Sequence, residues 1–575
     1  MRSIAIVALF ACGLLATVTF AAPTEPASSP IPAAADAASP DAETLALADI
    51  GRVWGFLKYH HPGVMKGAVN WDGTLIGILE AWLAASGDAR HADAIGKLLD
   101  AADATHPGPL TKASESVQPP GELLETRDSR WLDSSGSRIP EPLRQRLVTV
   151  LDCQRPRANH WIGQVPNVGN TTFNNELKHA ETDYPDTAYR LLGLFRFWNA
   201  MEYFFPYKGI IGVDWGTVLE GMIPKFRNAS DATAYHLAAL ELSTRIEDSH
   251  AAARSPLLNS HFGKLSLPFR LRWIEGKTVV VEAIEDLIEE DAIRNGDVVI
   301  AIDGVPLVRK LDELRPLTGA SNERGKFLKM HRWLIFGDEE EATIRVARGG
   351  EEVEATVRRY PGRVIQRKTT KRRGDPIWTL RDDGIGHVDM ARFLKKHIPD
   401  AMKELESARG IIFDMRAYPD FLLYDLLPHL SAEARPFAKF TMPLLDHPGV
   451  FVETPPIPVG PQGGNPKPYP GKVVVLVNET TVSRAEFITM AFQTVPGAKV
   501  IGIQTAGADG NVSMIPLPGQ ISVPFTGIGV FYPDGTETQR VGVRIDIPVE
   551  LTIAAAREGR DEVLERAVRY IDSGE

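Results

Sequence analysis

Cysteine is almost absent from this chain of 575 residues. Its two cysteines are Cys12, inside an apolar N-terminal segment, and Cys153. A single cysteine beyond that segment excludes an internal disulfide framework and a cysteine-based zinc site. The histidines form no H-E-x-x-H or comparable spacing, and no G-x-G-x-x-G or Walker-type loop precedes a helix. The sequence therefore predicts no metal and no cofactor.

Long apolar runs are absent after residue 22. Residues 1–22 combine Arg2, an apolar core and small residues, which is typical of a cleaved signal peptide. No later run approaches 18 apolar residues, so we expect an exported protein, periplasmic or secreted, without an integral membrane segment. The apolar run continues past Cys12, so we do not expect a lipoprotein anchor. Residues 23–42, rich in Pro, Ala and Ser, are predicted to be a flexible linker.

Charge of one sign is not concentrated anywhere. The formal net charge of -11 is spread along the chain, without a basic stripe or an acidic tail. Nucleic acid is therefore not expected as a partner.

An internal repeat occupies the N-terminal half. The segment "RVWGFLKYHHPGVMKGAVNWDG", from Arg52, aligns without gaps with "RFWNAMEYFFPYKGIIGVDWGT", from Arg196, at an offset of 144 residues. Each copy has helical periodicity broken by a proline turn, which predicts two helical modules, 43–106 and 186–256. Their aromatic residues are expected in the core rather than in a ligand site. The Pro- and Gly-rich residues 107–185 are predicted to be an irregular connector with some strand.

Residues 262–360 are predicted to form a small β-domain. "ATIRVARGGEEVEATVRR" indicates a hairpin around Gly349 and Gly350. "RNGDVVIAIDGVP" resembles the PDZ signature, which implies a domain that adds an extended peptide as an extra strand. The alternative is a β-domain that serves only as a spacer.

Residues 376–575 alternate between strand and helix patterns. Four short apolar runs, "GIGHVDM", "GIIFDMR", "VVVLVN" and "KVIGIQ", are strand candidates separated by helical stretches. This alternation predicts an α/β domain with a largely parallel central sheet, within a multidomain α+β protein. Ligands gather beyond the carboxyl ends of such strands. Ser483 and the loop after Arg416 both follow strand ends, so we expect them at the same edge.

Ser483 has two interpretations. With Glu486 it forms S-x-x-E at the start of a helix, the pattern of a capping box. It also lies where a strand leads into a helix, and backbone N–H groups at a helix N-terminus can stabilise an oxyanion. The pattern alone leaves both roles open.

From about residue 240 to 552 the chain resembles the tail-specific (C-terminal-processing) serine protease family. The similarity rests on an ordered series of blocks: "DSH", the PDZ-like segment, "GIGHVDMARF", "GIIFDMRAYP", "VVVLVNETTVSRAEF", "KVIGIQTAG" and "YPDGTETQRVGVRIDIPV". The resemblance implies an exported serine endopeptidase whose nucleophile is Ser483. Its partner would be a protein or peptide substrate, cut in an unstructured or C-terminal segment.

The chain lacks the lysine base of the better-known Ser-Lys branch. That lysine lies 25 residues after the nucleophile, where this chain has Ala508, and the nearest lysine after Ser483 is Lys499. A serine hydroxyl needs a proton acceptor. The tricorn-like branch uses a histidine preceded by a serine, which implies His250 as general base and Ser249 as its partner.

A glutamate completes the tricorn-like set in the resembled family. Glu537 is the carboxylate of the right type in its block, and Gln539 is the alternative, which would orient by hydrogen bonding without charge. His106 occupies the position of His250 in the first repeat, and we interpret it as a relic of duplication. His250 as an ordinary histidine at a helix end remains the structural alternative.

The expected oxyanion hole also departs from the family pattern. The resemblance implies a Gly-Gly pair after D-x-R-x-x-P, where this chain has Asp420 and Phe421. The donors would be the N–H of Arg484 and that of Asp420 or its neighbour. A non-glycine backbone approaches a substrate less freely. A catalytically weak or inactive peptide- or ligand-binding protein is therefore the second hypothesis, and an ester hydrolase with the same Ser-His chemistry is the third.

Overall fold

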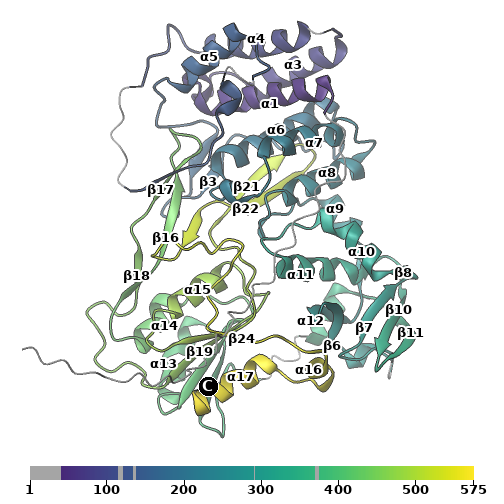
Figure 1. Ribbon diagram of the computed structural model, residues 1–575, viewed down its shortest axis with the longest axis vertical. Helices are drawn as coiled ribbons and strands as arrows, with labels where there is room; N and C mark the ends of the chain where they lie inside the picture. Colours follow the sequence, from purple (N-terminus) through teal and green to yellow (C-terminus); the bar gives the residue numbers. More distant parts are fainter. Residues whose placement is uncertain are drawn as a thin grey trace, which may run out of the picture. The chain divides into compact units, whose positions relative to one another are not determined.

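The computed structural model describes residues 40–574, apart from 88, 114–120, 134–136, 290–291 and 370–374. The expected signal peptide and most of the expected linker lie outside the described residues. Within them the chain is a mixed α+β, multidomain protein with many helices and several sheets (Figure 1). No helix in this part combines the length and apolar character needed to cross a membrane.

The two repeated segments fold into matching sets of helices. The first set is α1 (Ala42–His60), α2 (Pro62–Met65), α3 (Trp71–Ala84) and α4 (Ala89–Asp103). The second is α6 (Thr187–Phe204), the 3-10 turn η2 (Lys208–Ile210), α7 (Trp215–Arg227) and α8 (Ala232–Thr244). Trp71 and Trp215, which begin α3 and α7, are separated by the same 144 residues as the repeat.

Each repeat is closed by the same pair of tryptophan hydrogen bonds. The indole N–H of Trp54 donates to the carbonyl of Trp71 at 3.3 Å, and that of Trp71 donates back to Trp54 at 3.0 Å. Trp198 and Trp215 repeat this exchange at 2.7 and 3.1 Å. All four side chains are buried, where an indole N–H needs an acceptor. The repeated tryptophans therefore hold α3 against α1 and α7 against α6.

The connector between the repeats contains a helix that the sequence analysis did not predict. Its elements are β1 (Leu123–Glu125), the 3-10 turn η1 (Arg130–Leu132), α5 (Glu141–Leu151), β2 (Ile162–Gln164) and β3 (Thr171–Phe173). In α5 the buried residues Leu147 and Val150 are three positions apart, so one face packs on the core. The surrounding Pro- and Gly-rich sequence hides this short apolar stripe.

A hairpin from the C-terminal half shares the core of the helical layer. The hairpin strands are β21 (Val512–Leu517) and β22 (Ile521–Thr526), and five of their residues lie in the same buried cluster as the helices. Arg196 donates to the carbonyl of Pro516 at 2.9 Å, and the Tyr235 hydroxyl donates to that of Pro518 at 2.8 Å. The helical modules and the C-terminal half are thus joined by one continuous core.

Four charged side chains are buried together in the helical layer. Lys58 pairs with Asp72 at 3.0 Å and with Glu176 at 2.7 Å, while Arg196 pairs with the same two carboxylates at 2.5 and 2.7 Å. All four side chains are at most 4% exposed. The two positive and two negative charges balance, which is a condition for burying ions at this depth.

Residues 262–360 form a separate sheet flanked by helices. The sheet order is β11-β10-β7-β6-β5, and β10 and β11 form the expected hairpin, with Gly349 and Gly350 both at positive φ. Its strands are β5 (Phe269–Ile274), β6 (Lys277–Ala283), β7 (Val298–Ile302), β10 (Glu341–Arg348) and β11 (Glu351–Arg358), and the short β8 (Val305–Pro306) pairs with β7. A second, three-stranded sheet has the order β12-β4-β9, with β4 (Leu265–Ser266), β9 (Phe336–Gly337) and β12 (Tyr360–Pro361). The helices and 3-10 turns are α9 (Pro256–His261), η3 (Glu285–Leu287), α10 (Leu307–Leu314), η4 (Arg315–Leu317), α11 (Glu323–Leu334) and α12 (Gly362–Thr369). Helix α11 packs against β5, the edge strand.

The C-terminal half is built on a sheet of order β13-β14-β15-β19-β20-β24. Its strands are β13 (Trp378–Leu380), β14 (Ile385–Asp389), β15 (Gly410–Asp414), β19 (Lys472–Val477), β20 (Lys499–Gly502) and β24 (Ile547–Pro548). Every pairing is parallel except that of β13 with β14. The four apolar runs noted in the sequence are β14, β15, β19 and β20.

Helices cover both faces of this sheet (Figure 1). The helices are α13 (Ile398–Glu404), α14 (Leu423–Leu430), α15 (Arg484–Phe492), α16 (Ile553–Glu558) and α17 (Glu562–Ser573), with a 3-10 turn η6 (Lys395–His397) before α13. Along β19, Val473 and Val475 pack in the cluster with α13, α14 and α15, whereas Val474 and Leu476 pack in the cluster with α17. This alternation explains why a strand buried on both faces reads as a continuous apolar run.

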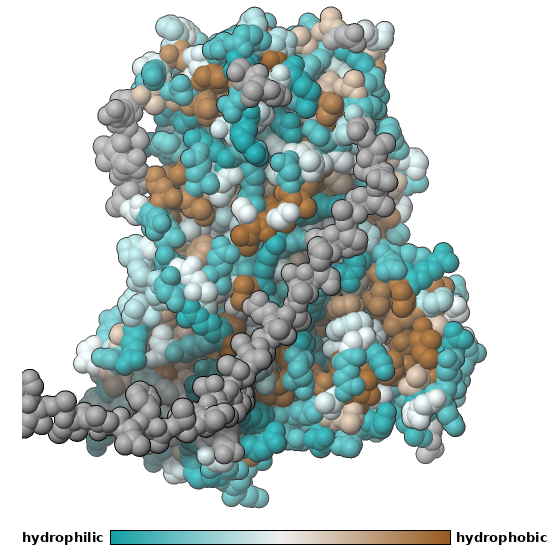
Figure 2. Space-filling model, in the orientation of Figure 1, coloured by the Kyte–Doolittle hydropathy of each residue, from teal (hydrophilic) through white to brown (hydrophobic). Residues whose placement is uncertain are grey.

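A second, antiparallel sheet joins the connector to the C-terminal half. Its strands are β16 (Arg435–Pro443), β17 (Val450–Glu453), β18 (Ile457–Val459) and β23 (Gly529–Phe531), and β1 of the connector pairs with β17. The face drawn in Figure 2 is largely hydrophilic, with apolar groups over the β5–β11 sheet and α12. Apart from the strand expected within the connector, the sequence predicted no element of this second sheet.

The buried charge cluster leads to a stability prediction. In Glu176→Gln, Lys58 and Arg196 would share one carboxylate, so we expect a loss of about 3–5 kcal/mol in the free energy of unfolding. Urea unfolding followed by tryptophan fluorescence measures this loss. Asp93→Asn, which breaks the exposed pair with Lys97, is the control and should change the value by less than about 1 kcal/mol. Equal small effects in both variants would contradict the prediction.

Candidate active site

Ser483 lies on a strained turn between β19 and α15. Its backbone has φ 57° and ψ -124°, outside the extended region that an ordinary N-cap residue adopts. A non-glycine residue pays about 1–3 kcal/mol for such a conformation, which persists where the surroundings enforce it. Ser483 and Glu486 are placed as a capping box, with the Glu486 carboxylate on the Ser483 N–H and the Ser483 side chain facing the Glu486 N–H. A strained strand-to-helix turn is also how other folds expose a nucleophilic serine, so the cap and the nucleophile can be the same residue.

The buried carboxylate of Glu486 accepts hydrogen bonds from this turn and from the loop after β20. One carboxylate oxygen accepts from the N–H groups of Ser483 and Ala508 at 3.1 and 3.0 Å. The other accepts from the Thr505 hydroxyl at 2.5 Å and from the Gly507 N–H at 2.9 Å. Burial raises the pKa of Glu486 to about 7, while all four hydrogen bonds favour the ionised form. The capping glutamate therefore anchors the loop after β20 as well as the start of α15.

The loop after β20 binds both Ser483 and Ser249, the residue before His250. The Ser483 N–H donates to the carbonyl of Ala508 at 2.9 Å, and the Ser249 hydroxyl donates to that of Ala506 at 3.0 Å. Ala506 and Ala508 are two residues apart, so their Cα atoms are within about 7 Å. Segments separated by 233 residues in sequence thus bind the same short loop, although no hydrogen bond joins Ser483 directly to His250 among the described residues.

Hydrogen bonds define which nitrogen of His250 carries the proton. His250 Nδ1 lies 2.8 Å from the Thr526 hydroxyl, which in turn lies 2.9 Å from a carboxylate oxygen of Asp248. An ionised carboxylate only accepts, so the Thr526 hydroxyl donates to Asp248 and must accept from Nδ1–H. In neutral His250 the lone pair is then on Nε2, which has no partner among the described residues. This is the arrangement that a general base requires.

Asp248 and Thr526 were not identified from the sequence. Asp248 is fully buried and also accepts from the N–H groups of His250 and Thr526, at 2.9 and 2.6 Å. The motif D-S-H contains Asp248, and its adjacency to His250 was an available signal. Thr526 is 276 residues away at the end of β22, and nothing local links it to the histidine.

Burial is the main influence on the protonation of His250, and it favours the neutral form. Burial lowers its pKa; the carboxylate of Asp248 acts against this, and the cations Lys329 and Arg254 act with it. Lys329, on α11, is partly buried, and desolvation lowers its pKa to about 8. Its ammonium donates to the carbonyls of Ser249 and Gly319 at 2.7 and 2.5 Å. Lys329 therefore serves as a donor that fixes the 249–250 turn, a role the sequence did not indicate.

Glu537 and Gln539 are the two candidates for the last residue of the tricorn-like catalytic set, and Gln539 is the one near Ser249. Its side-chain amide contacts the Ser321 hydroxyl at 3.3 Å, and Ser321 exchanges hydrogen bonds with Ser249 at 2.8 and 2.9 Å. Glu537 is half-buried next to Phe531, and burial raises its pKa. Among the described residues it forms no hydrogen bond with Ser249 or His250.

The loop after β15 reaches the residue that follows Ser483. The guanidinium of Arg484 donates to the carbonyl of Pro419 at 3.4 Å. As the first residue of α15, Arg484 has an N–H without an acceptor inside the helix. The Phe421 N–H is already bound to the carboxylate of Asp420 at 2.9 Å. Of the two predicted donors on this loop, the N–H of Asp420 itself is the one left open.

His106 and Lys499, the other two side chains considered as the general base, do not lie next to Ser483. His106 is beside His61, with ring centroids 6.3 Å apart, in the first helical module. Lys499, on β20, pairs with Asp546 at 3.2 Å near the surface. Neither contacts Ser483 in the described part of the chain.

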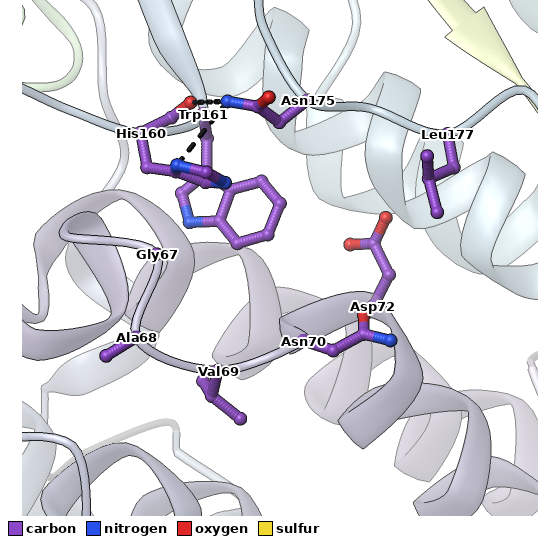
Figure 3. A pocket seen from close by; sticks show the side chains of 9 residues that line it. All are labelled: Gly67, Ala68, Val69, Asn70, Asp72, His160, Trp161, Asn175 and Leu177. Atoms are coloured by element: carbon purple, nitrogen blue, oxygen red, sulfur yellow. Dashed lines mark hydrogen bonds between the residues drawn. The ribbon is translucent and has the colours of Figure 1, made fainter.

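A cavity of about 340 Å³ lies in the helical layer, away from this arrangement (Figure 3). It is lined by the turn before α3 and by parts of the connector. Asn175 donates to the carbonyl of His160 at 2.7 Å, and both oxygens of Asp72 are bound to the buried cations. The cavity contains none of the residues expected to be catalytic. Within the described residues, no group of histidine, cysteine and carboxylate side chains is arranged to hold a metal ion.

A family model matches the part of the chain that resembles the tail-specific serine proteases. The model of peptidase family S41 matches residues 453–549, the part of the chain that contains Ser483. This match confirms the resemblance to the tail-specific serine proteases and supports a serine-type peptidase. The PDZ-like identity of residues 262–360 stays a prediction. No curated protein matches the sequence.

Solved structures agree at the level of the fold. Mature CPAF, in a complex with lactacystin, aligns with a TM-score of 0.52 at 16% identity, over 68% of this chain and 99% of that chain. The photosystem II D1 C-terminal processing protease and the tricorn protease also align, with TM-scores of 0.38 and 0.35 at 16% and 15% identity. They cover 63% and 67% of this chain, and 93% and 37% of theirs. The CPAF alignment shows a shared fold.

The hydrogen bonds of Glu486 predict that replacing one carboxylate oxygen lowers the stability of the protein. The amide nitrogen of Glu486→Gln cannot accept, so at least one buried backbone N–H would lose its acceptor. We expect a loss of about 1–3 kcal/mol in the free energy of unfolding, measured by urea denaturation. Glu558→Gln, at the exposed pair with Arg560, is the control and should shift stability by less than about 0.5 kcal/mol. A Glu486→Gln protein as stable as the control would show that the network is not needed.

Proposed function

We propose that this chain, a serine-type peptidase of the tail-specific kind, cleaves peptide bonds with Ser483 as nucleophile and His250 as general base. The observation that carries the proposal is the shared loop. Ser483, on its strained turn, and the Ser249–His250 pair are bound to carbonyls two residues apart. The free Nε2 of His250 supplies the proton acceptor that a serine hydroxyl needs.

In the proposed reaction, Nε2 of His250 takes the proton of the Ser483 hydroxyl as Oγ bonds to the substrate carbonyl carbon. The tetrahedral intermediate collapses when the C–N bond breaks, and His250 returns the proton to the leaving amine. Water, deprotonated by His250, then attacks the acyl-enzyme ester, and His250 returns the proton to Oγ of Ser483 as the C–O bond breaks. Thr526 and Asp248 keep Nδ1 protonated throughout. Ser249 and Gln539 act by positioning the histidine turn, and Glu537 remains a candidate for the same role.

The oxyanion would be stabilised by the N–H groups of Arg484 and Asp420. Two preorganised backbone donors are the usual minimum for such a site. The Asp420 carboxylate, held on the Phe421 N–H, places a negative charge on the same loop. This observation favours slow turnover, and it is also what supports the second candidate function, a peptide-binding protein with weak or no catalysis.

The substrate class follows from the proposed chemistry and the β-domain. An extended, unstructured or C-terminal protein segment can enter the site without unfolding a domain. Arg272 on β5 forms a two-point ion pair, at 2.6 and 2.5 Å, with Glu479 in the loop before Ser483. A peptide added to β5, the PDZ-like mode, would therefore lie close to the catalytic loop. Export to the periplasm or outside the cell is proposed on the N-terminal sequence alone.

Labelling of the mature protein by a fluorophosphonate probe tests the assignment. We expect wild type to be labelled and Ser483→Ala to remain unlabelled. His250→Ala should slow labelling and peptide cleavage by at least about 10³-fold, because assisted attack is lost. His106→Ala, the matched control at the equivalent repeat position, should stay within a few-fold of wild type. The rates are compared at equal folded fraction, measured by circular dichroism.

The pH dependence distinguishes histidine from lysine. Only neutral His250 accepts a proton, so cleavage falls as pH drops through its pKa. Since burial lowers that pKa, we expect the fall below about pH 6.5, the value of an unperturbed histidine.

In the labelling experiment, full labelling of His250→Ala would refute the assignment of His250 as the base. No labelling of wild type would favour the alternative of a peptide-binding protein.

The Thr526 relay predicts a difference between two substitutions. Thr526→Val removes the acceptor for Nδ1–H, so we expect kcat to fall by about 10²-fold with little change in KM, because orientation and tautomer are lost. Thr526→Ser keeps the hydroxyl and should retain most activity. Steady-state kinetics on an unstructured protein substrate measures both variants. Equal rates in both would show that the hydroxyl does not support His250.

A further inference from the structure

Three large aromatic side chains are exposed together on the loop after β15 and on α14. Tyr418, Phe421 and Tyr424 have exposed fractions of 51, 47 and 50%. The rings of Phe421 and Tyr424 lie 6.0 Å apart in an edge arrangement. A group of exposed large apolar side chains typically marks a binding site rather than a structural need.

This aromatic group continues onto the helix that begins after Ser483. Phe421 is nearly parallel to Phe487, with ring centroids 6.5 Å apart and an interplanar angle of 13°. The Phe487 N–H donates to the Ser483 carbonyl at 3.0 Å, so the ring belongs to the first turn after the nucleophile. Behind it, Phe487 contacts Phe437 and Phe440. Phe421 thus packs on Phe487, a partly buried ring one helical turn from Ser483, which in turn packs on the buried Phe437.

The charged neighbours restrict what can bind there. Arg484 lies over the ring of Tyr418 at 5.3 Å, which places a cation at one side. Asp420 binds its own loop through the Phe421 N–H, and Asp425 pairs with Lys395 at 2.5 Å. Arg484 disfavours a cationic ligand and Asp420 an anionic one, whereas the rings themselves offer apolar surface. A neutral, large apolar side chain fits best.

We propose that Tyr418, Phe421, Tyr424 and Phe487 form a substrate subsite for an aromatic or large aliphatic side chain next to the scissile bond. The inference rests on the proposed function and adds a sequence preference to it. The ligand ring would stack on Phe421 or meet its edge, as aromatic pairs prefer. Phe421 stands where the resembled family has a glycine. This one difference would account for both the subsite and the altered oxyanion loop.

Two alanine-rich peptides test the subsite: one carries a single Phe, and the other has Ser at the same position. Cleavage products are identified by mass spectrometry. We expect wild type to cut beside Phe, with kcat/KM at least tenfold above that for the Ser peptide. In Phe421→Ser and Tyr424→Ser this ratio should approach one. Val308→Ser, at a 70% exposed position on α10, is the matched control and should keep the wild-type ratio.

Binding separates the subsite from catalysis. Fluorescence anisotropy with Ser483→Ala should show at least tenfold tighter binding of the Phe peptide than of the Ser peptide, and a second substitution, Phe421→Ser, should abolish the difference. If no peptide is cleaved but this preference is seen, the proposed function fails and the subsite stands. Cleavage or binding without preference for Phe, or a preference that survives both aromatic substitutions, would overturn the subsite.

Discussion

The site depends on one buried carboxylate, that of Glu486. Ser483 is held in a backbone conformation that costs about 1–3 kcal/mol for a residue with a side chain. Four hydrogen bonds to Glu486 offset this cost by tying Ser483, Thr505, Gly507 and Ala508 to the first turn of α15. The same loop presents the carbonyl that receives Ser249. Without this carboxylate the strained turn and the loop that positions the histidine would lose their common anchor.

The helical modules support His250, the proposed base, rather than Ser483, the proposed nucleophile. The hairpin β21–β22 buries Ile515, Val523 and Phe525 in the core of the helical layer. Thr526 ends this hairpin, and Asp248 and His250 follow α8, the last helix of the second module. The relay from Asp248 through Thr526 to His250 is therefore formed where two distant parts of the chain share one core. This explains how a duplicated helical layer, with no reacting group of its own in the first copy, can matter for catalysis.

Much of this architecture could be predicted from local patterns. The apolar runs identified the parallel strands, Gly349–Gly350 identified a hairpin, and the 144-residue offset identified matching helices. Ser483 followed from the strand, the capping pattern and the family resemblance. Thr526, Ser321 and Lys329 could not be found in this way, because each contacts the 248–250 segment from at least 72 residues away. The strands β16–β18 could not be predicted, because β17 pairs with β1 and β16 pairs with β23, and local sequence does not reveal such distant pairings.

The proposed site has Ala508 where the Ser-Lys branch has its lysine, and the backbone there still contacts Ser483. Ala508 is fully buried, its N–H binds Glu486 and its carbonyl receives the Ser483 N–H. The backbone at this position therefore still lies against the nucleophile, although a methyl group has no proton to exchange. An ammonium here would need solvent or a counter-ion; burial raises the pKa of Asp509 and Glu486 beside it, and the Glu486 oxygens already accept four hydrogen bonds. A proton acceptor entering from a second segment, with its own carboxylate and hydroxyl, avoids that cost. The loss of the lysine is then compatible with a complete Ser-His arrangement and does not by itself argue for an inactive protein.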